Sequence, residues 1–233
     1  DRHHPCVVFW SAGNEGGNGQ NVAAMIEAGK KLDPTRPWMY GHMGVDWNAA
    51  FKDIIGPRYG MRGRGSLEDL GKSPGRPSYM DEYSNGRGNS QEGIIKKATL
   101  FRKYRRLNGG AIWDWINQGV KKQSADGKTY YEIKLYSIPL NGLLFSTREP
   151  QPELFELKKV FQPVAAEAVD LSSGRVKVTN WYNFTNLNEL DCQFELVRNG
   201  EVIEQGPLNI SLEPGSSRVV TIPFSKPKPV AGA

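Results

Sequence analysis

The stretch CVVFWSAGNEGGNGQNVAAMIEAGKKL, residues 6–32, holds the clearest structural pattern in this 233-residue chain. It begins with an apolar run over 6–10 that predicts a buried strand, and it ends with apolar residues at helical spacing over 21–32. Between them, glycines and asparagines surround a single carboxylate, Glu15. A buried strand followed by a helix is the repeating unit of a parallel α/β sheet or barrel.

The same alternation continues to about residue 147. A second helix is predicted over 90–107, with Ser90 as its N-cap and Gly109 just past its end. A full (β/α)8 barrel takes about 250 residues, or about 31 per unit. Five strands in this span therefore predict the last five units of a TIM barrel over residues 1–149, with about three units missing upstream. The five predicted strands are 6–10, 37–41, 53–56, 77–82 and 110–115.

The pattern changes after residue 163. Residues 164–233 read as alternating strands joined by turns, and Asn199-Gly200 is a hairpin signal. We expect an all-β domain here, an antiparallel immunoglobulin-like β-sandwich. Residues 150–163 are predicted to form a linker helix between the two domains.

Composition excludes several classes of protein. The apolar runs are far shorter than the roughly 20 residues of a membrane helix, so no membrane partner is expected. The net charge is +5, but the basic residues form no stripe with interleaved aromatics, which argues against nucleic acid. Cys6 and Cys192 are too few for a disulfide framework and are interpreted as buried thiols. The three histidines lack zinc-ligand spacing.

Polar and aromatic residues gather where the predicted strands end, which is where TIM barrels place their active sites. Two carboxylates, a tyrosine and tryptophans are the inventory of a sugar-cleaving site. Taken singly, a strand-end glutamate is more often a cap or an ion-pair partner, and a tryptophan-rich strand is more often core. The strand-end groups are Asn14 and Glu15, Arg58 and Tyr59, Asp81 and Glu82, and 113–115.

Several ordered motifs carry a more specific signal. In chain order they are DRHHPCVVFWSAGNE, DIIGPRY, YMDEYSNGRGNS, NGGAIWDWINQG and LNGLLFSTREPQPEL. This series resembles glycoside hydrolase family 2, and within it the large bacterial β-galactosidases. The resemblance covers residues 1 to about 165 and extends more loosely into the predicted sandwich. It implies a retaining hydrolysis of terminal β-D-galactosides, with a β-galactoside oligosaccharide as the partner.

The resemblance also implies roles for the strand-end residues. Glu15 matches the general acid/base, and Asn14 matches a residue that bonds the sugar 2-hydroxyl. Glu82 matches the nucleophile, and Tyr59 matches a tyrosine that orients it. The acid must stay protonated while the nucleophile stays ionised, so the two carboxyls are expected to lie in different environments.

Further implied sites involve the sugar ring and metal ions. Trp113 matches a platform under the galactosyl ring, and Asn141 matches a residue near the 6-hydroxyl and a Na⁺ ion. Glu15 matches a Mg²⁺ ligand whose companions would lie upstream. The sandwich is expected to be a structural buttress, and homo-oligomerisation stays open.

Two positions depart from the family pattern. Asn85 stands where β-galactosidases usually carry a histidine that reads the sugar's 6-position, and Arg58 stands where an apolar residue is common. One interpretation is that Arg58 and Arg87 bind an anionic 6-substituent. The other is that both arginines point to solvent and Asn85 bonds the ordinary hydroxyl.

Three alternatives remain open at this point. The first is a sister activity of the family, β-glucuronidase or β-mannosidase. The second is a β-galactosidase for 6-modified galactose. The third is a chain that only binds carbohydrate or other proteins, because a partial barrel leaves raw sheet edges. The compartment, cytoplasmic or exported, is also undetermined.

Overall fold

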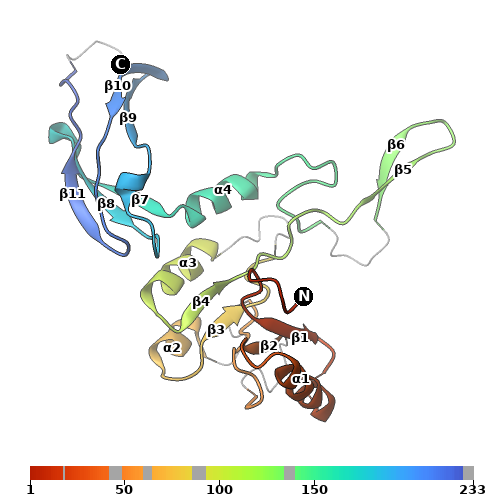
Figure 1. The fold of residues 1–233 in the computed structure, drawn as a ribbon. Coiled ribbons are helices and arrows are strands. Elements are labelled where there is room, and N and C mark those ends of the chain that lie inside the picture. The colour runs from red at the N-terminus through yellow and green to blue at the C-terminus, as the bar shows by residue number, and fades with distance from the viewer. Residues whose placement is uncertain (18, 42–48, 60–64, 86–92, 134–139, 228–233) are drawn as a thin grey trace. The chain divides into compact units, whose positions relative to one another are not determined.

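We describe a computed structural model of the chain, covering residues 1–17, 19–41, 49–59, 65–85, 93–133 and 140–227. The chain divides into two compact units, Asp1–Phe161 and Gln162–Ala233. Each unit is described by itself below (Figure 1).

Parallel strands form the centre of the first unit. β1 (Trp10–Asn14) pairs in parallel with β2 (Trp38–Gly41), and β3 (Ser78–Met80) pairs in parallel with β4 (Leu107–Gly110). The segment around Ile55 connects the two pairs, since Ile55 forms a parallel bridge with Ser78 and the Asp53 N–H donates to the Trp38 carbonyl at 2.8 Å. The predicted parallel α/β arrangement is therefore present.

The strand limits differ from those that the apolar runs predicted. Residues 6–9 form no strand, and β1 begins at Trp10, where the backbone first pairs with the segment that leads into β2. The predicted strand over 53–56 is reduced to the Ile55 bridge. The last predicted strand, 110–115, is replaced by β4, because Leu107 pairs with Ser78. Pairing partners, which the apolar pattern does not contain, set these limits.

Helices α1 (Gln20–Leu32) and α3 (Ile94–Lys103) correspond to the two predicted helices. α3 ends earlier than predicted, because the residues from Leu107 onward belong to β4; Ser90 lies outside the described residues. α4 (Pro152–Phe161) lies within the expected linker helix. α2 (Leu67–Lys72), which the sequence reading missed, begins at a capping box formed by Ser66 and Asp69. No helix in the described part of the chain is long and apolar enough to cross a membrane.

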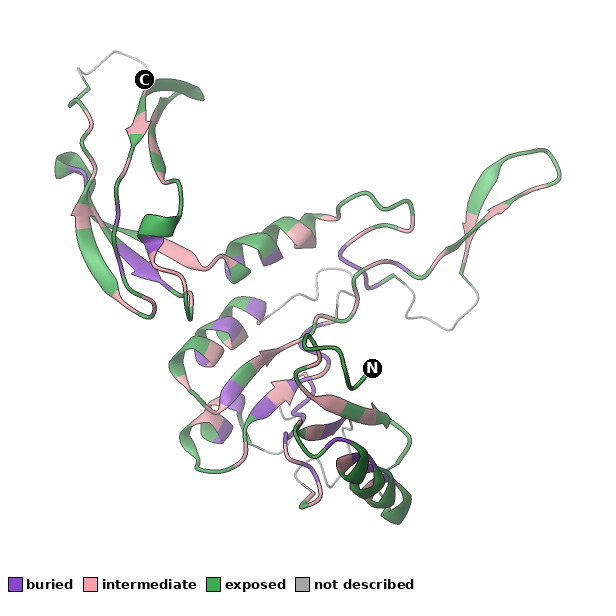
Figure 2. Ribbon diagram, in the orientation of Figure 1, coloured by how far each residue is buried: buried purple, intermediate pink, exposed green. Residues whose placement is uncertain are grey.

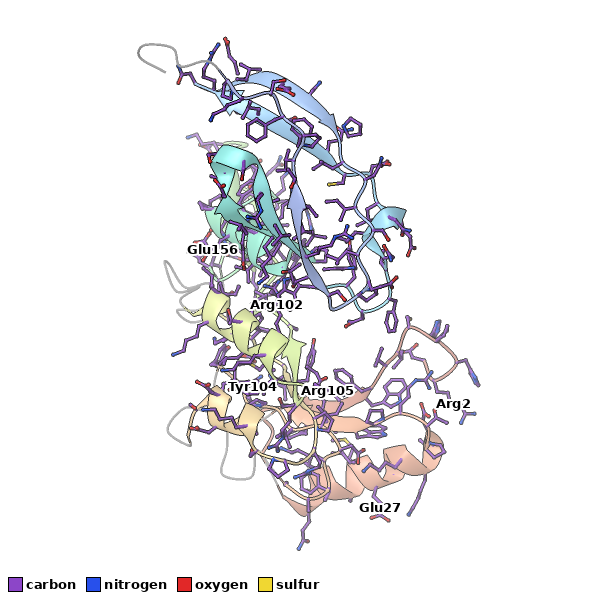
Figure 3. All side chains as sticks on the ribbon, turned by 90° about the vertical axis from the view of Figure 1, so that its left-hand side faces the viewer. Arg2, Glu27, Arg102, Tyr104, Arg105 and Glu156 are labelled. Carbon is purple, nitrogen blue, oxygen red and sulfur yellow. The ribbon has the colours of Figure 1, made fainter. Side chains whose placement is uncertain are left out.

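Two apolar clusters hold the first unit together. The smaller joins Val22 and Ile26 of α1 to Tyr40 of β2. The larger packs α2, α3 and α4 against β3 and β4, where Figure 2 shows most of the buried positions of this unit. Tyr104, labelled in Figure 3, follows α3 and donates its hydroxyl to Glu68 of α2 at 2.9 Å. These clusters fix the strands whose ends carry the candidate site.

Two further features of the first unit were not foreseen. A hairpin of β5 (Val120–Gln123) and β6 (Thr129–Glu132) follows β4 in the chain (Figure 1). The cysteines were also misjudged, because Cys6 is exposed and Cys192, in the second unit, is only half-buried. Both are free thiols.

The second unit contains two antiparallel sheets. β7 (Val164–Asp170), β8 (Arg175–Asn180) and β11 (Ser217–Thr221) form one, in the order β11-β8-β7. β9 (Gln193–Arg198) and β10 (Glu201–Pro207) form the other, joined by the predicted turn, with both Asn199 and Gly200 at positive φ. A single apolar cluster takes residues from both sheets or from their flanks. Its buried members are Val178, Leu187, Ile210 and Leu212.

Candidate active site

The polar cluster that the sequence predicted lies at the ends of three parallel segments of the sheet. Asn14 ends β1 and Glu15 follows it, with the Glu15 N–H donating to the Gly41 carbonyl at 2.9 Å. Glu82 follows β3, and its carbonyl accepts from the Tyr59 N–H at 3.2 Å. The backbone ladder thus brings the three strand ends to one edge of the sheet, with β2 between β1 and the segment of Tyr59.

The backbone at this edge is held in an uncommon conformation. Glu15 and Tyr59 have φ values of 52° and 47°, in the left-handed region that non-glycine residues seldom occupy. Such residues cost on the order of 1–3 kcal/mol each and cluster at functional sites. Gly41 is required by close approach, because a Cβ there would overlap the Asp81 carboxylate and press on the Asn14 amide. The fold accepts local strain to bring these groups together.

Arg58 lies at the centre of the cluster. Its side chain is 1% exposed, and its Nε donates to Asp81 Oδ2 at 2.9 Å. Nη1 donates to Glu15 Oε1, and Nη2 donates to both Asn14 Oδ1 and Glu82 Oε1. One guanidinium therefore binds both predicted catalytic carboxyls. The interpretation in which Arg58 points to solvent is wrong.

The second oxygen of Glu82 is bound from the other side. Tyr59 donates its hydroxyl to Glu82 Oε2, as the resemblance implied for an orienting tyrosine. Asn85 donates from Nδ2 to the same tyrosine oxygen at 3.4 Å. Asn85, Tyr59 and Glu82 thus form a hydrogen-bonded chain, and each was a predicted site residue. Arg87 lies outside the described residues.

The two candidate carboxyls occupy different environments. The side chain of Glu82 is 10% exposed and that of Glu15 is 57% exposed. Burial raises the pKa of Glu82, while Arg58 acts to lower it and the charge of Glu15 acts to raise it further. Burial likewise raises the pKa of Asp81, against the opposing effect of Arg58. In this chain the predicted nucleophile is the more buried of the pair, and its burial opposes the ionised form that the nucleophile role needs.

Backbone hydrogen bonds connect the segments that carry Trp113 and Asn141 to the segment that follows Glu82. The Trp113 N–H donates to the Ser84 carbonyl at 2.9 Å, beside a parallel bridge between Asn85 and Trp113. The next residue, Asp114, donates its N–H to the Asn141 carbonyl at 3.0 Å. Trp113 is 37% exposed, as a sugar platform must be, whereas Asn141 is fully buried. Asn141 therefore lies behind the site, one segment beyond Trp113.

Asn117 fixes the segment that carries Asn141. Its Oδ1 accepts the Gly142 N–H at 2.9 Å, and its own N–H donates to the Leu144 carbonyl at 2.9 Å. A side chain at Gly142 would overlap the backbone of Ile116 and Asn117, so the two segments touch without an intervening Cβ. This contact holds Asn141 next to the Trp113 segment.

The implied metal ions fit the described residues only in part. No group of three or more histidine, cysteine, aspartate and glutamate side chains suited to a metal occurs in the described part of the chain. Glu15 is engaged with Arg58, so the Mg²⁺ site is not assembled by these residues. The Asn141 amide is buried, and its Oδ1 and Nδ2 have no hydrogen-bond partner among the described residues. That orphaned oxygen suits one ligand of a cation such as Na⁺.

Two members of the cluster were not predicted as site residues. Arg58 was named as a strand-end group and as a possible binder of an anionic 6-substituent, and Asp81 as a strand-end acid, but neither was assigned to the two catalytic carboxyls. The signal was present in the sequence, because a basic residue predicted at the same edge as three acids is expected to pair with them. The sequence did not show how deeply the Arg58 side chain is buried, because its burial depends on the packing around it.

Comparisons with known proteins identify the family of this chain. Residues 1–166 match the TIM barrel domain of glycosyl hydrolases family 2, and residues 176–231 match domain 4 of β-galactosidase. The chain belongs to glycosyl hydrolases family 2. The predicted family is confirmed.

Curated relatives are named β-galactosidase. That of Leuconostoc mesenteroides is 33% identical over 97% of this chain and 24% of its own length. That of Vibrio cholerae is 34% identical over 92% of this chain and 22% of its own length. The chain therefore spans about a quarter of the length of these relatives.

Among solved structures, Bacteroides uniformis β-glucuronidase 2 aligns with 88% of this chain and 28% of its own, at 15% identity and a TM-score of 0.43. This similarity is too low to assign residue correspondences.

Proposed function

We propose that this chain is part of a retaining exo-β-galactosidase, in which Glu82 is the nucleophile and Glu15 the general acid/base. The observation that carries the proposal is the binding of both carboxyls by one guanidinium at the ends of β1 and β3, with the Tyr59 hydroxyl on Glu82. The curated relatives named β-galactosidase support the substrate class.

The proposed reaction has two steps. Glu82 attacks the anomeric carbon while Glu15 protonates the departing glycosidic oxygen, which forms a covalent galactosyl-enzyme. Glu15 then removes a proton from water, and the water oxygen displaces Glu82 with overall retention. Retention requires the carboxyls to be about 5 to 5.5 Å apart, against about 6.5 to 9.5 Å for inversion.

The remaining site residues are assigned to the sugar. Asn14 would bond the 2-hydroxyl, Trp113 would stack under the ring, and Asn85 would lie toward the 6-position. Asn141 would contribute to a Na⁺ site, and Glu15 to a Mg²⁺ site whose other ligands are not among the described residues.

The domain assignment is part of the same proposal. Residues 1–149 would be the C-terminal five units of the (β/α)8 barrel, and 150–163 its linker helix. Residues 164–233 would be an immunoglobulin-like buttress. The two antiparallel sheets support that class of domain, as does an apolar cluster from β7, β8, β11 and the flanks of β9 and β10.

Azide rescue tests the two roles in the protein that contains the complete barrel. Glu15→Gly should slow poor leaving groups most, because these need protonation, and azide should partly restore turnover of an activated aryl galactoside. The product should then be the β-galactosyl azide. Glu82→Gly should respond differently and give the α-azide. The same product anomer from both variants would refute the assignment, as would free sugar released with inverted configuration.

The sister activities are separated by substrate. Nitrophenyl β-glucuronide and β-mannoside should be hydrolysed far more slowly than the β-galactoside. The distinction decides the substrate class only, because all three reactions would use the same two carboxyls.

A further inference from the structure

We propose that Arg58 is a positioning residue of this active site: anchored by Asp81, its guanidinium holds Glu15 and Glu82 in the arrangement that the reaction needs. The inference rests on the proposed function and goes beyond it, because the family often carries an apolar residue at this position.

The geometry of Arg58 leaves it little freedom. Its side chain is 1% exposed, and the three nitrogens of the guanidinium each donate to a different side chain or pair of side chains. A planar fork with fixed donor directions restrains its acceptors in angle as well as in distance. The carboxyls of Glu15 and Glu82 are therefore positioned by one rigid group.

Asp81 fixes the position of the Arg58 guanidinium. Its Oδ2 accepts from Nε, the nitrogen nearest the backbone, at 2.9 Å, and its side chain is 18% exposed. The bond to Asp81 leaves Nη1 and Nη2 directed at Glu15 and Glu82. Gly41 makes room for the carboxylate, since a Cβ there would overlap Asp81 Oδ2.

Charge balance gives the arrangement its energetic reason. Three carboxyls surround Arg58, and two of them, on Asp81 and Glu82, are largely buried. Like charges at such short range repel, and a buried carboxylate without a partner is costly. One central positive charge reduces both costs, because it attracts each of the three carboxyls.

The same contacts argue against Arg58 as a reader of an anionic 6-substituent. An anion would have to compete with the carboxylates already bound to Nη1 and Nη2. Three acids around one arginine also leave the cluster with a surplus of negative charge when they are ionised. The contacts therefore do not favour the interpretation in which Arg58 binds an anionic 6-substituent of the sugar.

The test uses the protein with the complete barrel and measures kcat and KM separately on an aryl β-galactoside. Arg58→Met introduces an apolar side chain of similar length, and Arg58→Lys keeps the charge but loses the fork. Both should lower kcat by roughly tenfold or more, because charge-assisted hydrogen bonds to the reacting carboxyls are lost, while KM changes by less than about threefold. Arg58→Ala should regain part of its kcat when guanidinium ion is added below denaturing concentration.

Arg106→Met is the matched control. Arg106 is also held in place by several hydrogen bonds, to the carbonyls of Leu70, Ser73 and Arg76, but it precedes β4 at the opposite end of the strands. This variant should lower the melting temperature, leave kcat near the wild-type value and show no response to guanidinium.

Three outcomes would overturn the inference. The first is an Arg58→Met enzyme with kcat within about threefold of wild type. The second is a loss that appears only in KM, and the third is an Arg58→Ala enzyme whose kcat guanidinium leaves unchanged. Should Arg58→Met fail to fold, Arg58→Lys and Asp81→Asn carry the same kcat test. A wild-type protein that hydrolyses no galactoside would instead refute the proposed function, so the two failures are distinguishable.

Discussion

Tyr59 is the residue through which the hydrogen-bonding of Glu82 is most easily tested. Its hydroxyl donates to Glu82 Oε2 and also accepts from Asn85. Tyr59→Phe removes a donor to a charged group, worth about 1.5 to 3 kcal/mol, so kcat/KM should fall by roughly tenfold or more. The measurement is a steady-state assay on an aryl β-galactoside.

Tyr104→Phe provides the comparison for that variant. It removes a hydroxyl that donates to another glutamate, Glu68, away from the site. Its kcat/KM should stay near the wild-type value. Equal losses in the two variants would mean that Tyr59 acts only through stability.

The raised pKa of Glu82 predicts a pH-dependent effect on stability. Burial makes the folded state bind the Glu82 proton more tightly than the unfolded chain does. The contribution of Glu82 to the free energy of unfolding is therefore fully present below the pKa of this group in the unfolded chain, about 4.3. It is lost as the pH rises through the higher pKa of Glu82 in the folded state. Glu82→Gln removes the ionisation, so its melting temperature should exceed that of wild type at pH 7, and the difference should vanish near pH 4.

Glu156→Gln is the control for this experiment. Glu156, labelled in Figure 3, is an exposed residue of α4 and should give no stability difference at either pH. A lower melting temperature for Glu82→Gln at pH 7 would contradict the prediction, because it would mean that the attraction of Arg58 outweighs the cost of burial.

The sequence contained most of the residues of the candidate site but not the hydrogen bonds that connect them. Asn14, Glu15 and Glu82 could be found because a parallel α/β fold brings its strand ends to one edge. The depth of Arg58 could not be found. A basic residue at a strand end can extend into solvent or fold back onto the acids. Which of the two occurs depends on the surrounding packing and on the space that Gly41, which lacks a Cβ, leaves for the Asp81 carboxylate.

Among the elements, α2 offers the sharpest test of local stability. Ser66 Oγ accepts the Asp69 N–H at 3.0 Å, and Asp69 Oδ2 receives the Ser66 N–H in return at 3.2 Å. With only six residues, this helix depends on its cap. Ser66→Ala should cost about 1 kcal/mol of stability, whereas Ser66→Asp should retain most of it because aspartate is also a good N-cap.

Urea unfolding would measure the loss of stability in each variant, and hydrogen exchange of the α2 amides in the native state would show where it occurs. Ser66→Ala should increase exchange within α2 while leaving β7 and β8 unchanged, since these strands belong to the other unit. A Ser66→Asp variant as unstable as Ser66→Ala would show that the cap contributes little.

The limits of the elements were less predictable than their order. The apolar run 6–10 indicated a strand, but Val8 is 73% exposed and pairing begins only at Trp10. The strand over 53–56 shortens to one bridge because its neighbours on the two sides pair at different residues. Local patterns describe which residues prefer extended backbone, whereas partners decide which of them pair.

In the part of the chain that the structure describes, the parallel sheet of the first unit has an open edge at β1. Among the described residues, β1 pairs with β2 alone, so its other edge presents backbone groups without a strand neighbour. Glu15 follows this edge strand and is 57% exposed, the least enclosed carboxyl of the cluster. An open edge next to the acid/base is what a barrel would close with its preceding units.

The 233 residues expressed alone should therefore show negligible turnover of an aryl β-galactoside. Catalytic groups need a rigid and complete surround, and a displacement of about 1 Å can cost on the order of 100-fold in rate. The comparison is a longer protein that adds the preceding barrel units, assayed under the same conditions, with Glu82→Gln in the longer protein as the inactive reference. Circular dichroism should first show that the shorter chain is folded. Turnover by the folded short chain within about tenfold of the longer protein would mean that the described strand ends suffice for catalysis, and that the barrel count is wrong.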